Sequence, residues 1–330
     1  MKILKIFLLA TGFVILWATV RAVGWESILS HLNAVGFKFL PVLLIYAFIF
    51  AFDTLGWRYA FPKNLPTRVP FGDLCRIRLI GETLNHLIPW AASLGGEPIK
   101  AELLRRRHGI RLSEGFASIL IVHTTFWLSL NLFVIGGVAV TFKTLPLTPV
   151  LRNSVVAFLI VLGIGALLLV AGLHLGIFKR VHAIGKTFRW WGDESEEKKT
   201  RFLELDDQIK KFYTANFRSF FLSAFFNFLG WFAGIFEVYF LSKILGWNIS
   251  WEQAWLFEAL IQVLRITTFF IPSSIGAQEA GIVLIFLQFG FEKSLGLTFA
   301  VLRRIREMVW LGIGLVLSLA LEERPLPEKN

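Results

Sequence analysis

Two short stretches of the sequence place a helix-breaking pattern directly before a glutamate, within apolar surroundings. One runs from Pro89 to Glu97 and reads PWAASLGGE, and the other runs from Pro272 to Glu279 and reads PSSIGAQE. Proline and glycine interrupt helices. An ionised side chain in an apolar membrane segment costs at least a few kcal/mol, so such residues usually have a partner or a function. The two glutamates are therefore candidates for binding a cation or for balancing a basic side chain.

A group of arginines occupies the early part of the last apolar segment, where Arg303, Arg304 and Arg306 are followed by Glu307. Guanidinium groups bind phosphate bidentately, and helix N-termini favour anions. We therefore expect these arginines and the helix starts after the two breaks to hold a phosphate-bearing lipid headgroup. The two glutamates would pair with the arginines or receive an ammonium group. The i, i+3, i+4 spacing puts Arg303, Arg306 and Glu307 on one helical face and leaves Arg304 pointing elsewhere.

Other ionisable residues interrupt apolar segments, and structural roles compete with functional ones. These residues are Asp53, Arg58, Glu82, His86, Lys100, His123, Glu237, Glu258 and Arg265. His123 fits a packed, hydrogen-bonded histidine as well as a ligand, and Asp53 and Arg58 fit pairing with other helices. Glu82 and His86 have the i, i+4 spacing of a metal pair. A third ligand is not evident, so no metal and no cofactor is predicted.

The composition indicates that these residues are positioned within a membrane. Of 330 residues, 55% are hydrophobic and 17% are charged, whereas roughly a quarter of the residues of an ordinary soluble domain are charged. The single cysteine excludes a disulfide framework and a cysteine-based zinc site. The net charge of +11 fits cytoplasmic loops that face anionic lipid, so nucleic-acid binding is not predicted.

Runs of about 20 apolar residues predict helices that cross the bilayer. We expect an all-α, polytopic membrane protein, with one transmembrane domain over residues 1–330. Six full spans are expected, near residues 4–21, 37–61, 113–141, 151–173, 217–242 and 297–321. Residues 71–108 and 252–291 are predicted to form re-entrant helical hairpins, because irregular backbone in a bilayer must be buried in protein or line a wet cavity. The first span is read as a retained anchor, since Arg21 replaces the small residues of a cleavage site.

Lysine and arginine gather in the segments 61–80, 100–111 and 179–211. By the positive-inside rule, both termini lie in the cytoplasm and the protein lies in the cytoplasmic (inner) membrane. The run Arg105–Arg107 fits a topogenic patch in contact with lipid. Residues 179–215 are too polar to span and are expected to form an amphipathic connector on the inner surface. The apolar positions of this connector at helical spacing are Phe202, Leu205, Ile209 and Phe212.

The two broken stretches belong to halves of similar plan. Each expected hairpin lies between two full spans, in a first repeat at about 37–141 and a second repeat at about 217–321. The first hairpin is entered from the cytoplasm and the second from outside, so the halves run in opposite senses through the bilayer. Inverted repeats with broken helices occur in many secondary transporters, whose site lies at the repeat interface. The alternative is two unrelated proline and glycine kinks.

The motifs around the two breaks resemble those of a known family. The run GETLNHLIP at residues 81–89, followed by GGEPIK at residues 95–100 and a basic Arg105–Arg107, resembles the signature of the lysylphosphatidylglycerol synthase transmembrane region. This is a flippase-like family of integral membrane proteins. The stretch PSSIGAQEAG at residues 272–281 looks like the second motif of that family, which often reads PGGIGxxE. Two serines stand here in place of the usual glycines.

The resemblance covers nearly the whole chain and implies a lipid-flipping membrane module. In the multiple peptide resistance proteins of this family, a C-terminal cytosolic domain transfers lysine to phosphatidylglycerol. Nothing beyond residue 330 would hold that domain, so we expect the membrane module alone. The substrate-binding candidates are Glu82, Asn85, Glu97, Lys100, Glu279, Arg303, Arg304 and Arg306. The candidates for a structural role in the motifs are Pro89, Gly95, Gly96, Pro272 and Gly276.

The expected function is movement of a polar, phosphate-bearing lipid across the membrane, with aminoacylated and polyprenyl-linked lipids among the candidates. The expected partners are membrane lipids with anionic headgroups, together with a second copy of the chain or a lipid-modifying enzyme. The sequence contains no GxxxxGK[ST] phosphate loop, no HExxH and no GxSxG, so we expect a transporter rather than an enzyme. Two alternatives stay open: a membrane transferase acting on a lipid, and a non-catalytic scaffold for a lipid-modifying enzyme.

Overall fold

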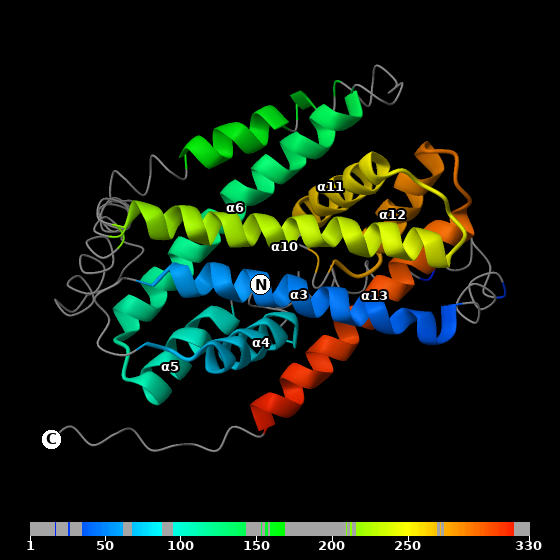
Figure 1. Cartoon of the computed structure of the whole chain (residues 1–330). Helices are drawn as coiled ribbons and strands as arrows, with labels where there is room; N and C mark the ends of the chain where they lie inside the picture. The colour runs from blue at the N-terminus through cyan, green and yellow to red at the C-terminus, as the bar shows by residue number, and fades with distance from the viewer. Residues whose placement is uncertain are drawn as a thin grey trace, which may run out of the picture.

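The regular structure of the protein is helical wherever the chain is described. The computed structural model describes residues 35–61, 68–87, 95–142, 159–168, 216–268 and 274–319, together with a few single residues (Figure 1). Within these ranges there is no strand, which confirms the predicted all-α class.

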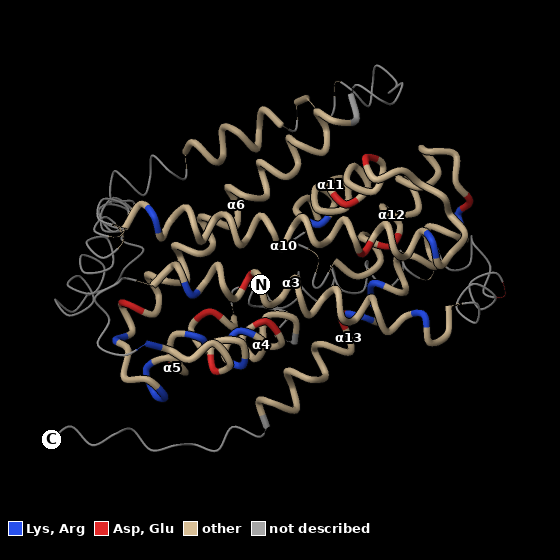
Figure 2. Tube along the Cα trace, in the orientation of Figure 1, with Lys and Arg blue, Asp and Glu red and all other residues tan. Residues whose placement is uncertain are grey.

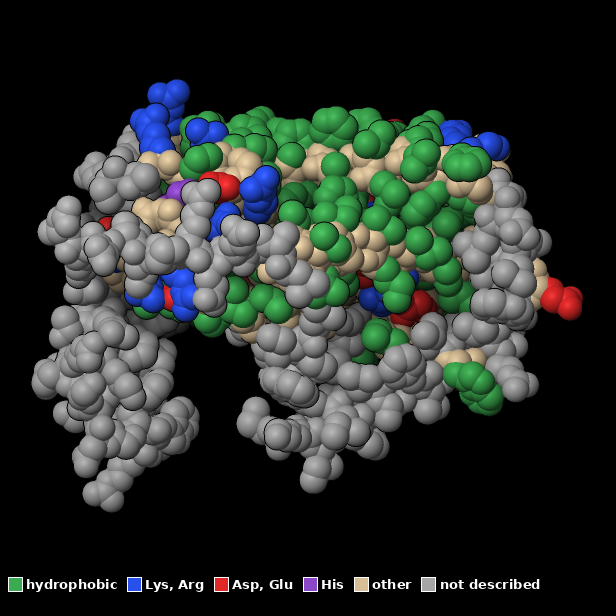
Figure 3. All heavy atoms as spheres, turned by 90° about the horizontal axis from the view of Figure 1, so that it is seen from below, with side chains coloured by type: hydrophobic (Ala, Val, Ile, Leu, Met, Phe, Trp, Pro, Cys, Tyr) green, Lys and Arg blue, Asp and Glu red, His purple; other side chains and the backbone are tan. Residues whose placement is uncertain are grey.

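Within the described ranges, three helices are long and apolar enough to cross a bilayer. They are α3 (Leu40–Tyr59), which follows the 3-10 turn η1 (Gly36–Phe39), α6 (Leu112–Phe142) and α10 (Phe217–Ile244). They coincide with three of the predicted spans. Their outward side chains, among them Phe48 and Phe225, are exposed although they are large and apolar. Figure 3 shows hydrophobic side chains over the middle of one face, with lysine and arginine toward its ends. Such a surface is typical of a membrane-embedded protein.

Each of the two predicted breaks separates a pair of shorter helices. The first pair is α4 (Phe71–Leu87) and α5 (Gly96–His108), and the second is α11 (Trp251–Thr267) and α12 (Ala277–Gln288). With 13 residues, α5 is about 20 Å long at 1.5 Å per residue, which is too short to cross a hydrocarbon core of about 30 Å. Pro89 and Pro272 lie outside the described residues.

The last helix, α13 (Lys293–Leu319), has the length of a span but a charged middle. It overlaps the predicted span 297–321 and carries three arginines and Glu307 where lipid would reject them. Figure 2 shows that charged residues gather in two places, around α4 and α5 and around α11, α12 and α13. The charges of α13 must therefore face other helices rather than lipid.

The helices α3 and α10 lie side by side and run in opposite directions (Figure 1). Tyr59 stacks on Phe226 with ring centroids 5.4 Å apart, while Asp53, six residues earlier, lies against Gly230. Residues later in α3 therefore contact residues earlier in α10, as expected for two antiparallel helices. Small residues at the crossing allow the two backbones to approach closely, as is common between membrane helices.

Several of the other helix contacts come in matching pairs. The helix α4 packs on α5 and on α13, while α11 packs on α12 and on α6. Similarly, α5 packs on α6 and α12 packs on α13. The pair α4–α5 therefore contacts α6, the long helix that follows it in the chain, and also α13. The pair α11–α12 contacts α13, the long helix that follows it, and also α6.

The apolar core is largest in the second half, where Trp247 packs on Phe257, Phe286 and Phe291 with ring centroids 4.8, 4.3 and 5.0 Å away. A smaller cluster in the first half includes Phe212. Phe212 and Ile209 are the described positions of the predicted connector, and both are buried. These two side chains therefore lie in the protein core.

Several predictions fall outside the described residues. They concern the span 4–21, most of the span 151–173, of which Leu159–Leu168 is an apolar helix, and most of the connector. The count of six spans and the cytoplasmic position of both termini therefore stay predictions.

A substitution at the start of α5 would test the close packing of α4 and α5. A Cβ atom on Gly96 would collide with the backbone carbonyl of Gly81 in α4. Because backbone cannot move aside cheaply, we predict that Gly96→Ala destabilises the protein by about 1–3 kcal/mol, measured as a lower thermal unfolding midpoint in detergent. The matched control is Gly312→Ala in α13, where a Cβ would meet nothing within 4 Å. Equal midpoints for the two variants would contradict the close crossing of α4 and α5.

Candidate functional site

A polar cavity of about 160 Å³ lies among α3, α4, α5, α6 and α10. Its volume suits a small polar group together with water. The polar residues that line it are Asp53, Arg78, Glu82, Asn85, Glu97, Lys100, His123 and Asn227. Its apolar lining consists of Trp57, Ile119, Val122 and Phe126. Four of the eight predicted substrate-binding residues, Glu82, Asn85, Glu97 and Lys100, are therefore brought together here.

Asn85 joins the end of α4 to the start of α5. Its Oδ1 accepts a hydrogen bond from the backbone N–H of Gly96 at 2.6 Å, and its Nδ2 donates to Glu97 Oε1 at 3.2 Å. The first backbone N–H groups of a helix have no partner within the helix. The side chain of Asn85 therefore caps α5 from the neighbouring helix and holds the carboxylate of Glu97 at the same time.

The two oxygens of Glu97 have different surroundings. Oε1 also accepts from Lys100 Nζ at 3.0 Å, and His123 Nε2 lies 3.4 Å from it. Oε2 is buried and has no hydrogen-bond partner in the part of the chain that the structure describes. A buried polar atom without a partner is unusual and costs stability, so this oxygen is a candidate acceptor for a ligand.

Arg78 forms the other charged contact of the cavity. Its guanidinium donates to Asp53 Oδ2 at 2.9 Å and to Glu82 Oε1 at 2.6 Å, and it lies 5.0 Å from the ring centre of Phe50. Arg78 belongs to the predicted basic segment 61–80, and its side chain is largely buried between two carboxylates. The i, i+4 spacing of Arg78 and Glu82 was the signal that could have identified the pair.

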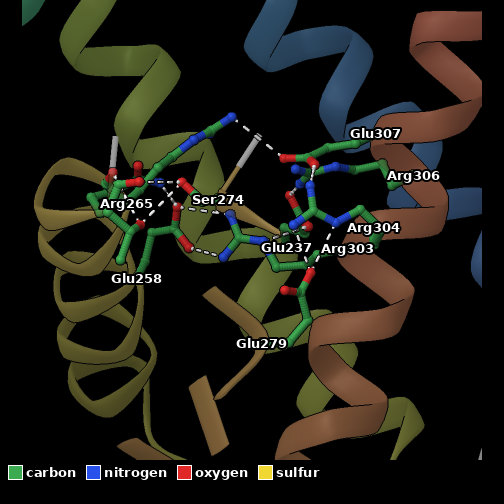
Figure 4. Close-up of polar contacts among 11 residues, drawn as sticks. Glu237, Glu258, Arg265, Ser274, Glu279, Arg303, Arg304, Arg306 and Glu307 are labelled. Carbon is green, nitrogen blue, oxygen red and sulfur yellow. Dashed lines mark hydrogen bonds and ion pairs between the residues drawn. The ribbon is translucent and has the colours of Figure 1, made fainter. Parts of the chain in front are cut away.

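A second charged cluster joins α10, α11, α12 and α13 (Figure 4). Glu237 comes from α10, Glu258 and Arg265 from α11, and Glu279 from α12. The four residues from α13 are Arg303, Arg304, Arg306 and Glu307. The predicted Glu279 and the three predicted arginines therefore lie together, away from the cavity around Glu97.

The most buried contacts of this second cluster are those of Arg303 and Arg306. Arg303 binds Glu258 bidentately, with N–O distances of 2.6 and 3.2 Å, and its Nε lies 3.6 Å from Glu237. Arg306 pairs with the second oxygen of Glu237, and its guanidinium lies 4.2 Å from the ring centre of Tyr46 in α3. These pairs link α13 to α10, α11 and α3.

Arg304 and Glu307 continue the network toward α12. Arg304 donates to Glu279 Oε1 at 2.6 and 2.9 Å and to Glu307 Oε2 at 2.8 Å. The other oxygen of Glu307 lies 3.4 Å from Arg265, whose side chain is 42% exposed. The prediction that Arg304 points away from Glu307 is therefore wrong, since a contact at i, i+3 on one turn joins them.

The second cluster is neutral overall, because its four arginines face four glutamates. Glu279 Oε2 also accepts from the backbone N–H of Gly276 at 2.6 Å and so caps α12. The arginines and the helix N-terminus were predicted to bind a phosphate. In the structure they bind carboxylates of the chain itself.

His86 lies between the two clusters. Its imidazole interacts electrostatically with Glu82 on one side and with Glu307 and Arg265 on the other. No contact among the described residues joins Glu97 to Glu279, so the two glutamates belong to separate clusters. The predicted structural positions Gly95, Gly96 and Gly276 lie at the starts of α5 and α12, and Gly276 has a positive φ of 79° that favours glycine.

The far end of α5 carries exposed charges that provide a control. Glu102 accepts hydrogen bonds from Arg105 at 2.6 and 2.8 Å and from Arg106 at 2.6 Å. These bonds lower the pKa of the Glu102 carboxyl to about 2, so it is ionised at neutral pH. Exposed pairs of this kind contribute little to stability.

Substitutions in the Arg303–Glu258 pair would test whether the second cluster stabilises the protein. We predict that Glu258→Gln lowers the free energy of unfolding by about 3–5 kcal/mol, because it leaves a buried guanidinium without its counter-charge. The double variant Glu258→Gln with Arg303→Gln should recover much of this loss. The measurement is thermal or denaturant unfolding in detergent, and Glu102→Gln, which should change stability by less than about 1 kcal/mol, is the control. Additive losses in the double variant would show that the two residues are not coupled.

Comparison with known proteins adds one finding. No curated protein and no solved structure matched the chain. A family model described as the lysylphosphatidylglycerol synthase TM region matches residues 3–314, which include both broken helix pairs and both charged clusters. Because this match covers nearly the whole sequence, the chain belongs to the lysylphosphatidylglycerol synthase transmembrane-region family of membrane proteins.

Proposed function

We propose that the protein moves the polar headgroup of a membrane lipid between the two leaflets of the cytoplasmic membrane. The observation that supports this most is the cavity beside the α4–α5 break, because it is lined by charged and amide side chains within a bundle whose outer surface is apolar. Ionisable groups at such positions usually mark a substrate pathway. The membership of a lipid-related family supports the same conclusion.

We further infer that the two halves form an inverted repeat. The helices α3 and α10 pack together in opposite directions, and the pairs α4–α13 and α11–α6 are equivalent contacts if the halves are related by a two-fold axis in the membrane plane. Transporters built in this way place their site near mid-depth at broken helices and expose it by moving one unit against another. The α4–α5 pair would then carry the site, while the acyl chains stay in lipid.

The two charged clusters would have different roles. The cavity around Glu97 offers both signs of charge, from Lys100 and Arg78 and from the carboxylates, so it suits a headgroup that contains a phosphate. The second cluster would hold α13 against α10, α11 and α12 through its ion pairs. Arg303 and Arg306 are then structural in the first place, and their substitution would unfold the protein before it reported on transport.

The test uses Glu97→Gln in proteoliposomes. A fluorescent phospholipid in the inner leaflet becomes accessible to an added quencher only when it moves outward, so the quenching rate measures translocation. We expect at least a tenfold slower rate for Glu97→Gln, because the carboxylate that faces the headgroup loses its charge. Glu102→Gln, on the exposed end of the same helix, should retain the wild-type rate.

Three results would contradict the proposal. Wild-type protein that leaves the quenching rate at the level of empty vesicles would exclude translocation of the lipid tested. A new lipid product in the same vesicles, found by mass spectrometry, would favour a membrane transferase instead. Equal rates for Glu97→Gln and the wild type would remove the cavity from the pathway.

A further inference from the structure

We propose that the cavity beside Glu97 is a binding site for a primary ammonium group, with Glu97 Oε2 as its principal acceptor; for a lipid-borne amine this inference rests on the proposed function. The side chain of Glu97 is 9% exposed, and Oε2 has no hydrogen-bond partner among the residues described. Oε1 is held by Lys100 and Asn85. The carboxylate is therefore fixed by one oxygen, while the other is buried without a partner in the described part of the chain.

His123 supplies a second acceptor on the same wall. Its Nε2 is buried without a hydrogen-bond partner within the described chain and lies 3.4 Å from Glu97 Oε1. In the tautomer that carries the proton on Nδ1, Nε2 accepts a hydrogen bond. An ammonium group has three donors, so it can bind Glu97 Oε2 and His123 Nε2 and leave one donor for water. The indole of Trp57, which also lines the cavity, already faces the ammonium of Lys100 at 6.0 Å.

The charge balance selects a cation. Asp53, Glu82 and Glu97 contribute three negative charges to the cavity, while Arg78 and Lys100 contribute two positive charges. Counted over these five side chains, the cavity has one negative charge in excess. The second cluster, with four arginines and four glutamates, has none. An incoming positive charge is therefore stabilised beside Glu97 and not beside Glu279.

The arrangement of donors and acceptors also selects the kind of cation. A guanidinium binds a carboxylate best through both oxygens, and one oxygen of Glu97 is already occupied. A quaternary ammonium has no N–H to donate to the open atoms. No group of three or more His, Cys, Asp or Glu side chains that could hold a metal ion occurs in the described ranges. A primary ammonium fits the site better than each of these.

The ammonium group could come from an ethanolamine lipid headgroup or from a soluble amine, and the experiment separates the two. The thermal midpoint of the purified full-length protein is measured in detergent with added phosphatidylethanolamine, phosphatidylcholine, phosphatidylglycerol or soluble ethylamine. We expect the ethanolamine lipid to raise the midpoint, and the lipids with a quaternary ammonium or without an amine to have a smaller effect. A rise with ethylamine as well would assign recognition to the amine itself, whereas a rise with the lipid alone would show that its phosphate is also needed.

Variants locate the site. Glu97→Gln should weaken the affinity for the ethanolamine lipid by about 10- to 100-fold, the loss expected for a hydrogen bond to a charged group. The control Glu102→Gln should bind as the wild type does. If Glu97→Gln fails to fold, His123→Leu removes the second acceptor instead and should weaken binding by several-fold.

Two outcomes would overturn the inference: equal stabilisation by all three lipids, or unchanged affinity in both cavity variants. Lipid translocation that depends on Glu97 without amine selectivity would end this inference and leave the proposed function intact. Selective amine binding without translocation would do the reverse.

Discussion

The guanidinium of Arg303 lies between two carboxylates, from Glu258 in α11 and Glu237 in α10, where water is almost excluded. A charge in such surroundings is tolerated only with a counter-charge in good geometry. The apolar surfaces of α10, α11 and α13 would allow many packings, but this requirement admits few, because the ion pairs join α13 to α10, to α11 and to α12. The arrangement of the second half therefore depends on the neutralisation of the arginines of α13.

The sequence predicts the elements better than their pairing. Unbroken apolar runs predicted α3, α6 and α10 because hydropathy is a local property, and Pro and Gly located the interruptions after α4 and α11. The partner of each charge is not local. Glu258 and Arg303 are 45 residues apart, and nothing in their flanking residues distinguishes this pair from others. The partner of Arg78, Asp53, likewise lies in another helix.

The two halves share a plan but not a charge balance. In both halves a short helix begins with a glutamate near its N-terminus, and the long helix that follows it in the chain packs against it. In the second half the cluster is neutral, and in the first it retains one negative charge. The charged side chains of α10 to α13 therefore join these helices to one another, whereas those of α4 and α5 line a cavity.

Glu97 and Glu279 differ by one position in their distance from the start of their helices. This difference accounts for the different contacts of their carboxylates. Glu279 is the third residue of α12, from which a carboxylate reaches back to the N-cap, and its two oxygens are taken by Gly276 N and Arg304. Glu97 is the second residue of α5, and the N–H of Gly96 is satisfied by Asn85 instead. Because Asn85 takes over the cap, Glu97 does not have to turn toward its own backbone. Its second oxygen is thereby left at the wall of the cavity without a hydrogen-bond partner among the described residues.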